Sequence, residues 1–228
     1  MNTERAPFDN PKVRKAVRLA VDRQELVDTV MGGEAVVSCD TPVAPTDQYR
    51  HNMGCKQNIA EAKKLLKEAG YPNGIEMVIH VSTKEPTWPT IAEVIQQQVA
   101  KAGIKVDIKM TPSKSYWKET WMKKDVAMTR WNERSADSVL HEVYHSGAKW
   151  NESYYKSSDF DKNLADARGE LNFKKRKALY EKAQHTLWEQ SGTMIPYHVS
   201  KLVVTNSRVK NLDEVEVFSI QWHKVKVD

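Results

Sequence analysis

Long hydrophobic runs are missing from this sequence, so it offers no candidate for a membrane-spanning helix. Such a helix needs roughly 20 consecutive apolar residues, and no stretch of the chain approaches that length. A secretory signal is also missing, because Met1 is followed by Asn-Thr-Glu-Arg without an apolar core. The opening residues therefore fit either a cytosolic protein or a piece of a longer precursor.

Cysteine is scarce, which limits the metal centres that the chain could build. The two cysteines, Cys39 and Cys55, lie in one polar stretch without regular patterning. A tetrahedral zinc site needs four ligands, and only His51 lies nearby. Two interpretations stay open, a disulfide formed in an oxidising compartment or two unrelated thiols, and we predict the disulfide.

A strong excess of one charge is absent as well. The net charge is +5, from 35 basic and 30 acidic residues, and the lysines are interleaved with acids. No arginine-rich run marks a nucleic-acid surface. No P-loop, nucleophile elbow or G-x-G-x-x-G pattern marks a nucleotide or catalytic site. We therefore expect no nucleic-acid partner, no cofactor and no enzymatic activity.

What the sequence does contain is a regular series of helical and strand patterns, which predicts an α/β fold. Residues 75–81 and 104–110 alternate apolar and polar side chains, and 90–102 between them has an apolar helical face. These three segments predict a parallel strand–helix–strand unit. Residues 34–57 read as a long loop. Helices are also expected over 11–31, 59–69, 113–123, 136–145, 158–169 and 172–190, and strands over 125–131, 194–199 and 202–205.

Several segments, in a fixed order, carry a resemblance to one family. They are residues 7–16 (PFDNPKVRKA) with 20–23 (AVDR), 62–71 (AKKLLKEAGY), 158–161 (SDFD) with 176–184 (RKALYEKAQ), and 195–196 (IP) with 209–212 (VKNL). Together they resemble the bacterial extracellular solute-binding proteins that serve peptide, dipeptide and nickel ABC importers. The matching segments span almost the whole chain.

This resemblance implies a periplasmic-binding-protein-like lobe, a mixed sheet flanked by helices. Members of the family have two lobes around a ligand cleft and about twice this length. Residues 1–212 would then be the second, C-terminal lobe, and 213–228 a tail that joins the missing first lobe. The implied function is capture of a peptide-like or small anionic solute and its delivery to ABC permease transmembrane subunits. The implied parent is exported, periplasmic or extracytoplasmic, peripheral to the membrane and monomeric.

The resemblance also suggests where the ligand binds. Trp131 ends the expected strand 125–131, and ligands of open α/β sheets bind beyond the carboxyl ends of strands. In the family a "W-x-x-D" segment borders the cleft, and its aspartate pairs with the amino terminus of a bound peptide. Here Arg134 stands at the matching position, and a guanidinium can bind a carboxylate or phosphate instead. An internal salt bridge to Glu133, Asp137 or another acid is the alternative.

Other aromatic and polar residues are further candidates for ligand contact. Trp150 opens an aromatic and amide cluster, and Trp117 lies on the helix before the strand that ends at Trp131. Asn132 and Met128 flank the expected cleft strand. Packing in the core is the alternative for each aromatic side chain.

One motif favours a different function. His141-Glu142-Val143-Tyr144-His145 matches H-E-x-x-H, in which two histidines on one helical face bind zinc and the glutamate serves as general base. A zinc-dependent hydrolase is therefore the alternative hypothesis, with surface metal binding by the two histidines as a weaker version of it.

Overall fold

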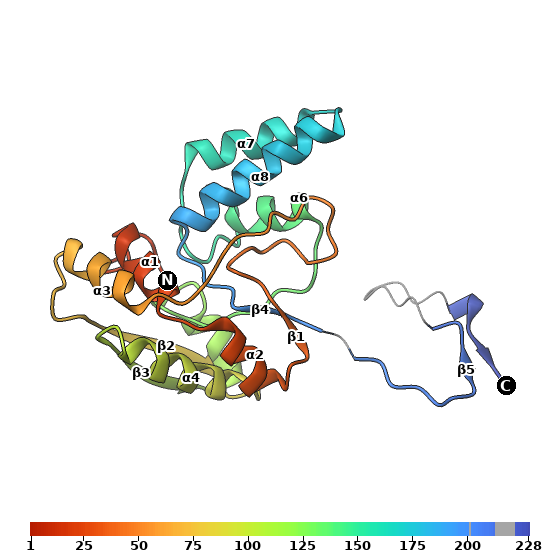
Figure 1. Cartoon of the computed structure of the whole chain (residues 1–228), viewed down its shortest axis with the longest axis horizontal. Coiled ribbons are helices and arrows are strands. Elements are labelled where there is room, and N and C mark those ends of the chain that lie inside the picture. Colours follow the sequence, from red (N-terminus) through yellow and green to blue (C-terminus); the bar gives the residue numbers. More distant parts are fainter. Residues whose placement is uncertain (201, 213–221) are drawn as a thin grey trace. The chain divides into compact units, whose positions relative to one another are not determined.

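The structure is a computed structural model that describes residues 1–200, 202–212 and 222–228. The chain divides into two compact units, Met1–His198 and Val199–Asp228 (Figure 1). The first unit mixes helices with short strand pairs, which confirms the α/β class. Among the described helices, none has the length and apolarity that a membrane crossing requires.

The expected helix over 11–31 is divided in two. Helix α1 (Pro11–Leu19) begins at Asn10, whose side chain accepts a hydrogen bond from the Lys12 amide. Helix α2 (Arg23–Met31) begins again at Asp22, whose carboxylate accepts from the amides of Gln24 and Glu25. The first amides of a helix have no partner within that helix, and the Asp22 side chain supplies one. The helical segment is therefore broken before α2.

The predicted parallel unit is confirmed. Strand β2 (Ile75–Ser82) pairs with β3 (Ile104–Thr111) in parallel along its whole length. Helix α4 (Trp88–Ala100) connects them and packs against the pair, while α3 (Ile59–Glu68) packs on α1 (Figure 1). Apolar side chains of these elements form the first of two hydrophobic cores.

The prediction of a strand over 125–131 is wrong, apart from one isolated bridge to β2. Ala127 bridges His80 of β2 in parallel, through hydrogen bonds from the His80 amide and to the His80 carbonyl. The hydroxyl of the buried Tyr116 lies 2.5 Å from the Met128 carbonyl and 3.0 Å from the His80 carbonyl. The Tyr116 hydroxyl thus occupies the Met128 carbonyl, which would otherwise continue the ladder. The chain leaves the sheet after Met128.

The long loop contains one short strand and a cross-link. Strand β1 (Ala35–Val37) pairs with β4 (Tyr197–Val199), so the expected strand 194–199 is shortened. Cys39 and Cys55 are joined, which confirms the predicted disulfide. No strand forms over 202–205, so that prediction is wrong; these side chains are exposed and lie outside the first compact unit.

A second core lies among the later helices of the first unit. The two helices expected here form as α7 (Ser158–Gly169) and α8 (Phe173–Gln190), and they pack against each other as a hairpin. The expected helix 136–145 consists of α6 (Ala136–Val139) and a π-helical turn, η2 (Leu140–Tyr144). The expected helix 113–123 likewise consists of α5 (Ser113–Ser115) and a π-helical turn, η1 (Tyr116–Thr120). The second core contains Phe160, Leu164, Tyr180, Ala183 and Leu187.

The second unit is small. Strand β5 (Val209–Lys210) pairs antiparallel with β6 (Lys226–Val227), and a short 3-10 turn, η3 (Trp222–Lys224), precedes β6. The chain end thus has a partner within the chain, which the sequence did not indicate. Most of the alternating tail, residues 213–221, lies outside the described residues. The expected boundary at residue 212 stays a prediction.

Candidate functional site

The site is built at the carboxyl ends of the parallel strands. Strand β2 ends at Ser82, and the segment that bridges it at Ala127 runs in the same direction toward Trp131. An ion pair of 3.2 Å between Arg130 Nε and Glu85 Oε1 ties this segment to the turn after β2. This is the edge at which ligands of open α/β sheets bind.

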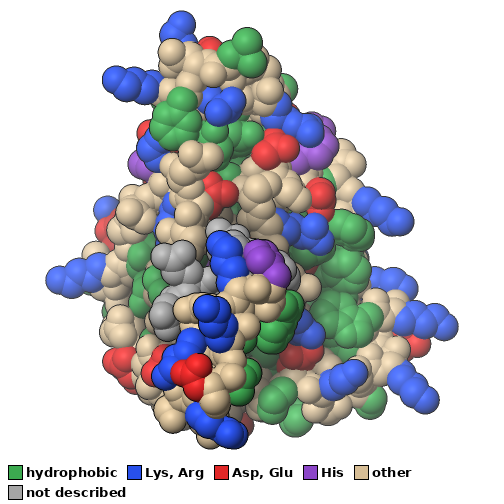
Figure 2. Space-filling model, turned by 90° about the vertical axis from the view of Figure 1, so that its right-hand side faces the viewer, with side chains coloured by type: hydrophobic (Ala, Val, Ile, Leu, Met, Phe, Trp, Pro, Cys, Tyr) green, Lys and Arg blue, Asp and Glu red, His purple; other side chains and the backbone are tan. Residues whose placement is uncertain are grey.

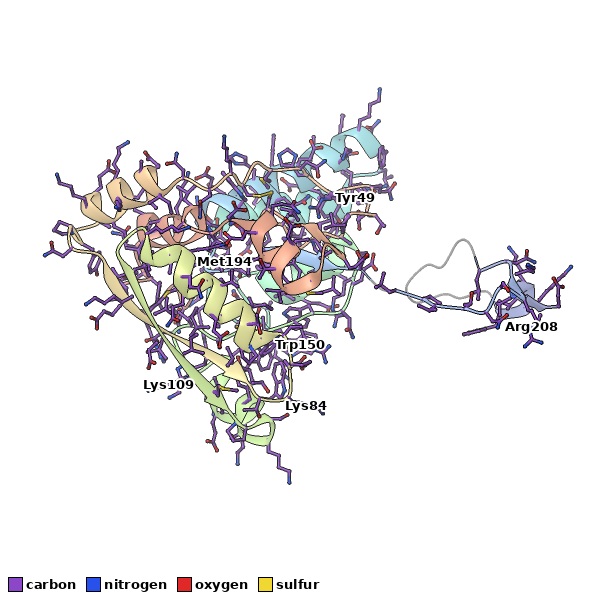
Figure 3. The ribbon with its side chains drawn as sticks, turned by 60° about the horizontal axis from the view of Figure 1, so that its bottom comes forward. Tyr49, Lys84, Lys109, Trp150, Met194 and Arg208 are labelled. Atoms are coloured by element: carbon purple, nitrogen blue, oxygen red, sulfur yellow. A yellow bond between two sulfur atoms is a disulfide. The ribbon has the colours of Figure 1, made fainter. Side chains whose placement is uncertain are left out.

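Four tryptophans form a continuous group, here called the tryptophan wall: Trp117, Trp121, Trp131 and Trp150. The ring centres of Trp117 and Trp121 lie 5.7 Å apart, and those of Trp131 and Trp150 lie 5.6 Å apart. Trp117 is 41% exposed and Trp150, which is labelled in Figure 3, is 36% exposed. Contiguous apolar surface often marks an interaction site, so the wall is a candidate binding surface.

Glu152 joins the two halves of the wall. Its carboxylate accepts hydrogen bonds from the indole nitrogens of Trp121, at 2.7 Å, and Trp131, at 3.3 Å. Burial raises the pKa of Glu152, although both indole hydrogen bonds act in the opposite direction. One carboxylate thereby fixes the orientation of two rings that belong to separate segments.

Glu152→Gln should reveal this buried carboxyl through the pH dependence of stability. Because its pKa is raised, the folded chain binds the proton more tightly than the unfolded chain. Its contribution to the free energy of unfolding is full below the ordinary carboxyl pKa and is lost as the pH rises through the folded value. We expect the stability of wild type relative to Glu152→Gln to fall as the pH rises above the ordinary carboxyl pKa of about 4.

Urea denaturation at several pH values measures this difference. Glu76→Gln, at a strand position where the side chain is 79% exposed, is the control for removal of one charge. A difference that stays flat or rises with pH would contradict the assignment.

Unusual backbone conformations lie beside the wall. Met122 and Tyr154 both have φ of 57°, a left-handed conformation that is uncommon for residues other than glycine. The Tyr154 hydroxyl donates a hydrogen bond to the Met122 carbonyl. Met122 follows Trp121, and Tyr154 is two residues after Glu152. The strained positions thus support the groups that hold the wall together.

Arg134 lies against the wall. Its Cζ is 5.5 Å from the ring centre of Trp131 and 5.8 Å from that of Trp150. Its Nη1 lies 3.0 Å from Glu142 Oε2, so an internal acid pairs with it, as the alternative interpretation expects. The pair leaves the arginine side chain 31% exposed, and a role in ligand contact stays a prediction.

The other predicted contact residues lie in two different environments. Met128 is partly buried and packs against the first core, whereas Asn132 is exposed. Sequence reasoning missed Trp121 and Glu152. The sequence does contain a tryptophan four residues after Trp117 and an acid two residues after Trp150. Neither spacing indicates that Trp121 and Glu152 meet.

The residues of the H-E-x-x-H motif contact one another and neighbouring side chains. The rings of His141 and His145 lie 5.1 Å apart, but His141 Nδ1 is 3.3 Å from an Arg168 nitrogen. Glu142 is engaged by Arg134 and by the Ser138 hydroxyl, at 2.9 Å. Within the described residues, no group of three His, Cys, Asp or Glu side chains is arranged to hold a metal ion.

The tryptophan wall is separate from two surface hollows. One hollow lies between α7 and α8 and the other beside the start of α1, and no wall residue lines either of them. Figure 2 shows the cationic side chains of one face spread among acidic and uncharged ones.

Comparison with known proteins decides the family. Residues 1–151 match the family model described as "Bacterial extracellular solute-binding proteins, family 5 Middle". The chain belongs to family 5 of the bacterial extracellular solute-binding proteins. This confirms the resemblance, and it favours a solute-binding protein over the zinc hydrolase.

Two relatives of this family 5 chain are named as glutathione-binding proteins. The chain is 32% identical over 221 residues to the glutathione-binding protein GsiB of Salmonella choleraesuis, covering 91% of this chain and 43% of that protein. The GsiB of Escherichia coli strain K12 is also 32% identical, with the same coverage. The chain thus spans less than half the length of these relatives.

Solved structures of periplasmic binding proteins share its fold. DppA from Helicobacter pylori, in complex with the peptide STSA, matches with a TM-score of 0.80 and 28% identity over 100% of this chain and 46% of that one. HbpA2 from Haemophilus parasuis matches with a TM-score of 0.77 and 27% identity, over 88% and 41% of the two chains. The expected periplasmic-binding-protein-like fold is confirmed.

The motifs that resemble family 5 are structural in this chain. Arg14 is buried, and its guanidinium donates to the carbonyls of Phe8, Asp9, Gln190 and Ser191. These bonds tie the start of α1 to the end of α8. The motif residues therefore identify the fold, while none of them belongs to the wall.

Proposed function

We propose that this chain forms one side of the ligand site of an ABC importer's substrate-binding protein. The exposed tryptophan wall at the strand ends, with Arg134 against it, carries this proposal. Solute sites combine aromatic surface with a few polar groups that fix orientation. The ligand is a peptide-like or small anionic solute, in keeping with the glutathione-binding relatives and with the similar structure that holds a bound peptide.

The rest of the protein would lie in the sequence that the relatives have and this chain lacks. We propose that residues 1–212 are the second lobe and that 213–228 join the first lobe. The complete protein would be a monomer outside the cytoplasm, peripheral to the membrane, and would pass its solute to the permease transmembrane subunits. It would bind its ligand without catalysing a reaction.

Ligand contact is assigned to Trp117, Trp131, Arg134 and Trp150, with weaker contact from Asn132 and Met128. Trp117 and Trp150, the two most exposed tryptophans of the wall, offer faces for stacking. The indole N–H of Trp131 already donates to Glu152, so this ring offers its face and not its donor. Asn132 is free to reach outward, because it is exposed beside Trp131.

Titration of the chain with glutathione and with the dipeptide Met-Leu tests the proposal. One wall offers only part of the buried surface that a closed site provides, so we expect a Kd on the order of millimolar. NMR signals of the wall indoles should shift, and Trp150→Ala should abolish the shifts. Trp222→Ala, which removes a 69% exposed tryptophan of the second unit, is the matched control.

Two results would contradict the proposal in different ways. Micromolar affinity of the chain alone would mean that it is a complete binding protein and not one lobe. Binding that survives Trp150→Ala but is lost in the Trp222→Ala control would move the site away from the wall.

A further inference from the structure

We propose that Arg134 and Glu142 act together to recognise a zwitterionic headgroup, an ammonium and a carboxylate carried on one carbon, as in an α-amino acid. This inference rests on the proposed function and names the ligand chemistry at the wall. It differs from the simple expectation of an anionic ligand at Arg134, because the structure places an acid beside the arginine.

The two side chains form a partly exposed pair of opposite charges, in which Arg134 Nε and Glu142 Oε2 are buried and have no hydrogen-bond partner. Arg134 Nη1 lies 3.0 Å from Glu142 Oε2, and the side chains are 31% and 36% exposed. In the described part of the chain, Arg134 makes no other ion pair or hydrogen bond. Glu142 also accepts from the Ser138 hydroxyl through Oε1. A guanidinium has five N–H donors and a carboxylate about four acceptor positions, so both groups can bind a further partner.

Neighbouring charges are already engaged with other partners. Arg130 pairs with Glu85, and Arg168 pairs with Asp137 at 3.1 Å. Glu133 accepts a hydrogen bond from the Thr46 hydroxyl. Arg134 instead pairs with Glu142, and its guanidinium lies over the rings of Trp131 and Trp150.

The paired acid determines which ligand the site prefers. A ligand with only a carboxylate would gain Arg134 but lie beside the like charge of Glu142. A ligand with only an ammonium would gain Glu142 but lie beside the like charge of Arg134. A zwitterion that lies antiparallel to the pair places its carboxylate on the arginine and its ammonium on the glutamate, so all four neighbouring contacts are attractive.

The wall strengthens this recognition. Trp131 and Trp150 lie within 6 Å of the guanidinium, close enough to hold it by cation–π attraction. Indole rings also displace water from around the charges, and attraction between charges rises as the local dielectric falls. The exposed face of Trp150 would receive the apolar side chain of the same ligand.

Three probes that share the phenylalanine side chain and differ in their charged groups test the inference on the full chain. They are L-phenylalanine, N-acetyl-L-phenylalanine, which lacks the ammonium, and L-phenylalaninamide, which lacks the carboxylate. The readout is the set of indole NMR signals during titration. We expect L-phenylalanine to shift the signals of Trp131 and Trp150 and each blocked probe to bind about tenfold more weakly.

Variants separate the two charges. Glu142→Gln should remove the preference over the N-acetyl probe, and Arg134→Gln should remove the preference over the amide probe. Glu133→Gln, which removes an adjacent acid outside the pair, should leave the order of the three probes unchanged. Both side chains of the pair are partly exposed, so we expect the variants to fold. The probe series on the wild-type chain gives a result even if a variant does not fold.

The outcomes distinguish this inference from the proposed function. If the N-acetyl probe shifts the wall signals at the same concentration as L-phenylalanine, the wall binds ligands but does not recognise a zwitterion. If all three probes shift only indoles outside the wall, both the inference and the wall assignment are wrong.

Discussion

Arg23→Ala is expected to lower the free energy of unfolding by about 3–5 kcal/mol, the range found when one partner of a buried ion pair is removed. Arg23 and Asp40 are each 3% exposed, and Arg23 Nη2 lies 2.5 Å from Asp40 Oδ2. Arg23 also donates to the carbonyls of Arg18, Val21 and Cys55. Its removal would leave the Asp40 charge buried and these carbonyls without a donor.

Urea denaturation of the two variants Arg23→Ala and Arg5→Ala measures the effect. Arg5 pairs with Asp125, but these side chains are 53% and 50% exposed, so the control should lose about 1 kcal/mol or less. Asp40→Asn, which keeps the shape and removes the charge, is a milder second variant. Equal losses from Arg23→Ala and Arg5→Ala would refute the assignment of a buried pair.

Reduction of the Cys39–Cys55 disulfide is expected to lower the free energy of unfolding by about 3 kcal/mol, because it frees a loop of this length in the unfolded chain. The bond closes a segment with a sequence separation of 16. Within that segment, the Asp47 carboxylate accepts from the Ala136 amide at 2.7 Å, and the Thr46 hydroxyl donates to Glu133. The loop therefore supports the chain on both sides of Arg134.

Denaturation with and without a reductant measures the loss. The Cys39→Ser/Cys55→Ser variant is the control, because it should match reduced wild type and should not respond to the reductant. An identical midpoint for oxidised and reduced wild type would contradict the prediction.

The two predicted losses should not simply add. Arg23 donates to the Cys55 carbonyl at 3.4 Å, and its partner Asp40 follows Cys39 in the chain. Groups that share partners show coupling energies of about 0.5–3 kcal/mol in double-mutant cycles. We expect Arg23→Ala to cost less in the reduced chain than in the oxidised one.

Local patterns predicted most of the elements of the first unit. The cap at Asn58, the alternation in β2 and β3, and the apolar faces of α4 and α8 depend on residues that are close in sequence. The break before α2 is also a local feature, since Asp22 is a good helix cap, but it lies inside a longer helical pattern that hides it. The expected strand 125–131 failed for another reason, because the Tyr116 hydroxyl, from a different segment, takes the place of a ladder hydrogen bond.

The sequence by itself indicated most of the helices, the parallel unit, the disulfide and the family, because capping, periodicity and motif order can be read along the chain. Only the tertiary structure decided that Glu152 joins Trp121 to Trp131, that Arg23 is buried on Asp40, and that Arg134 meets Glu142. These contacts depend on how separate segments pack, since burial selects partners by shape and charge across the core and not by their spacing along the chain.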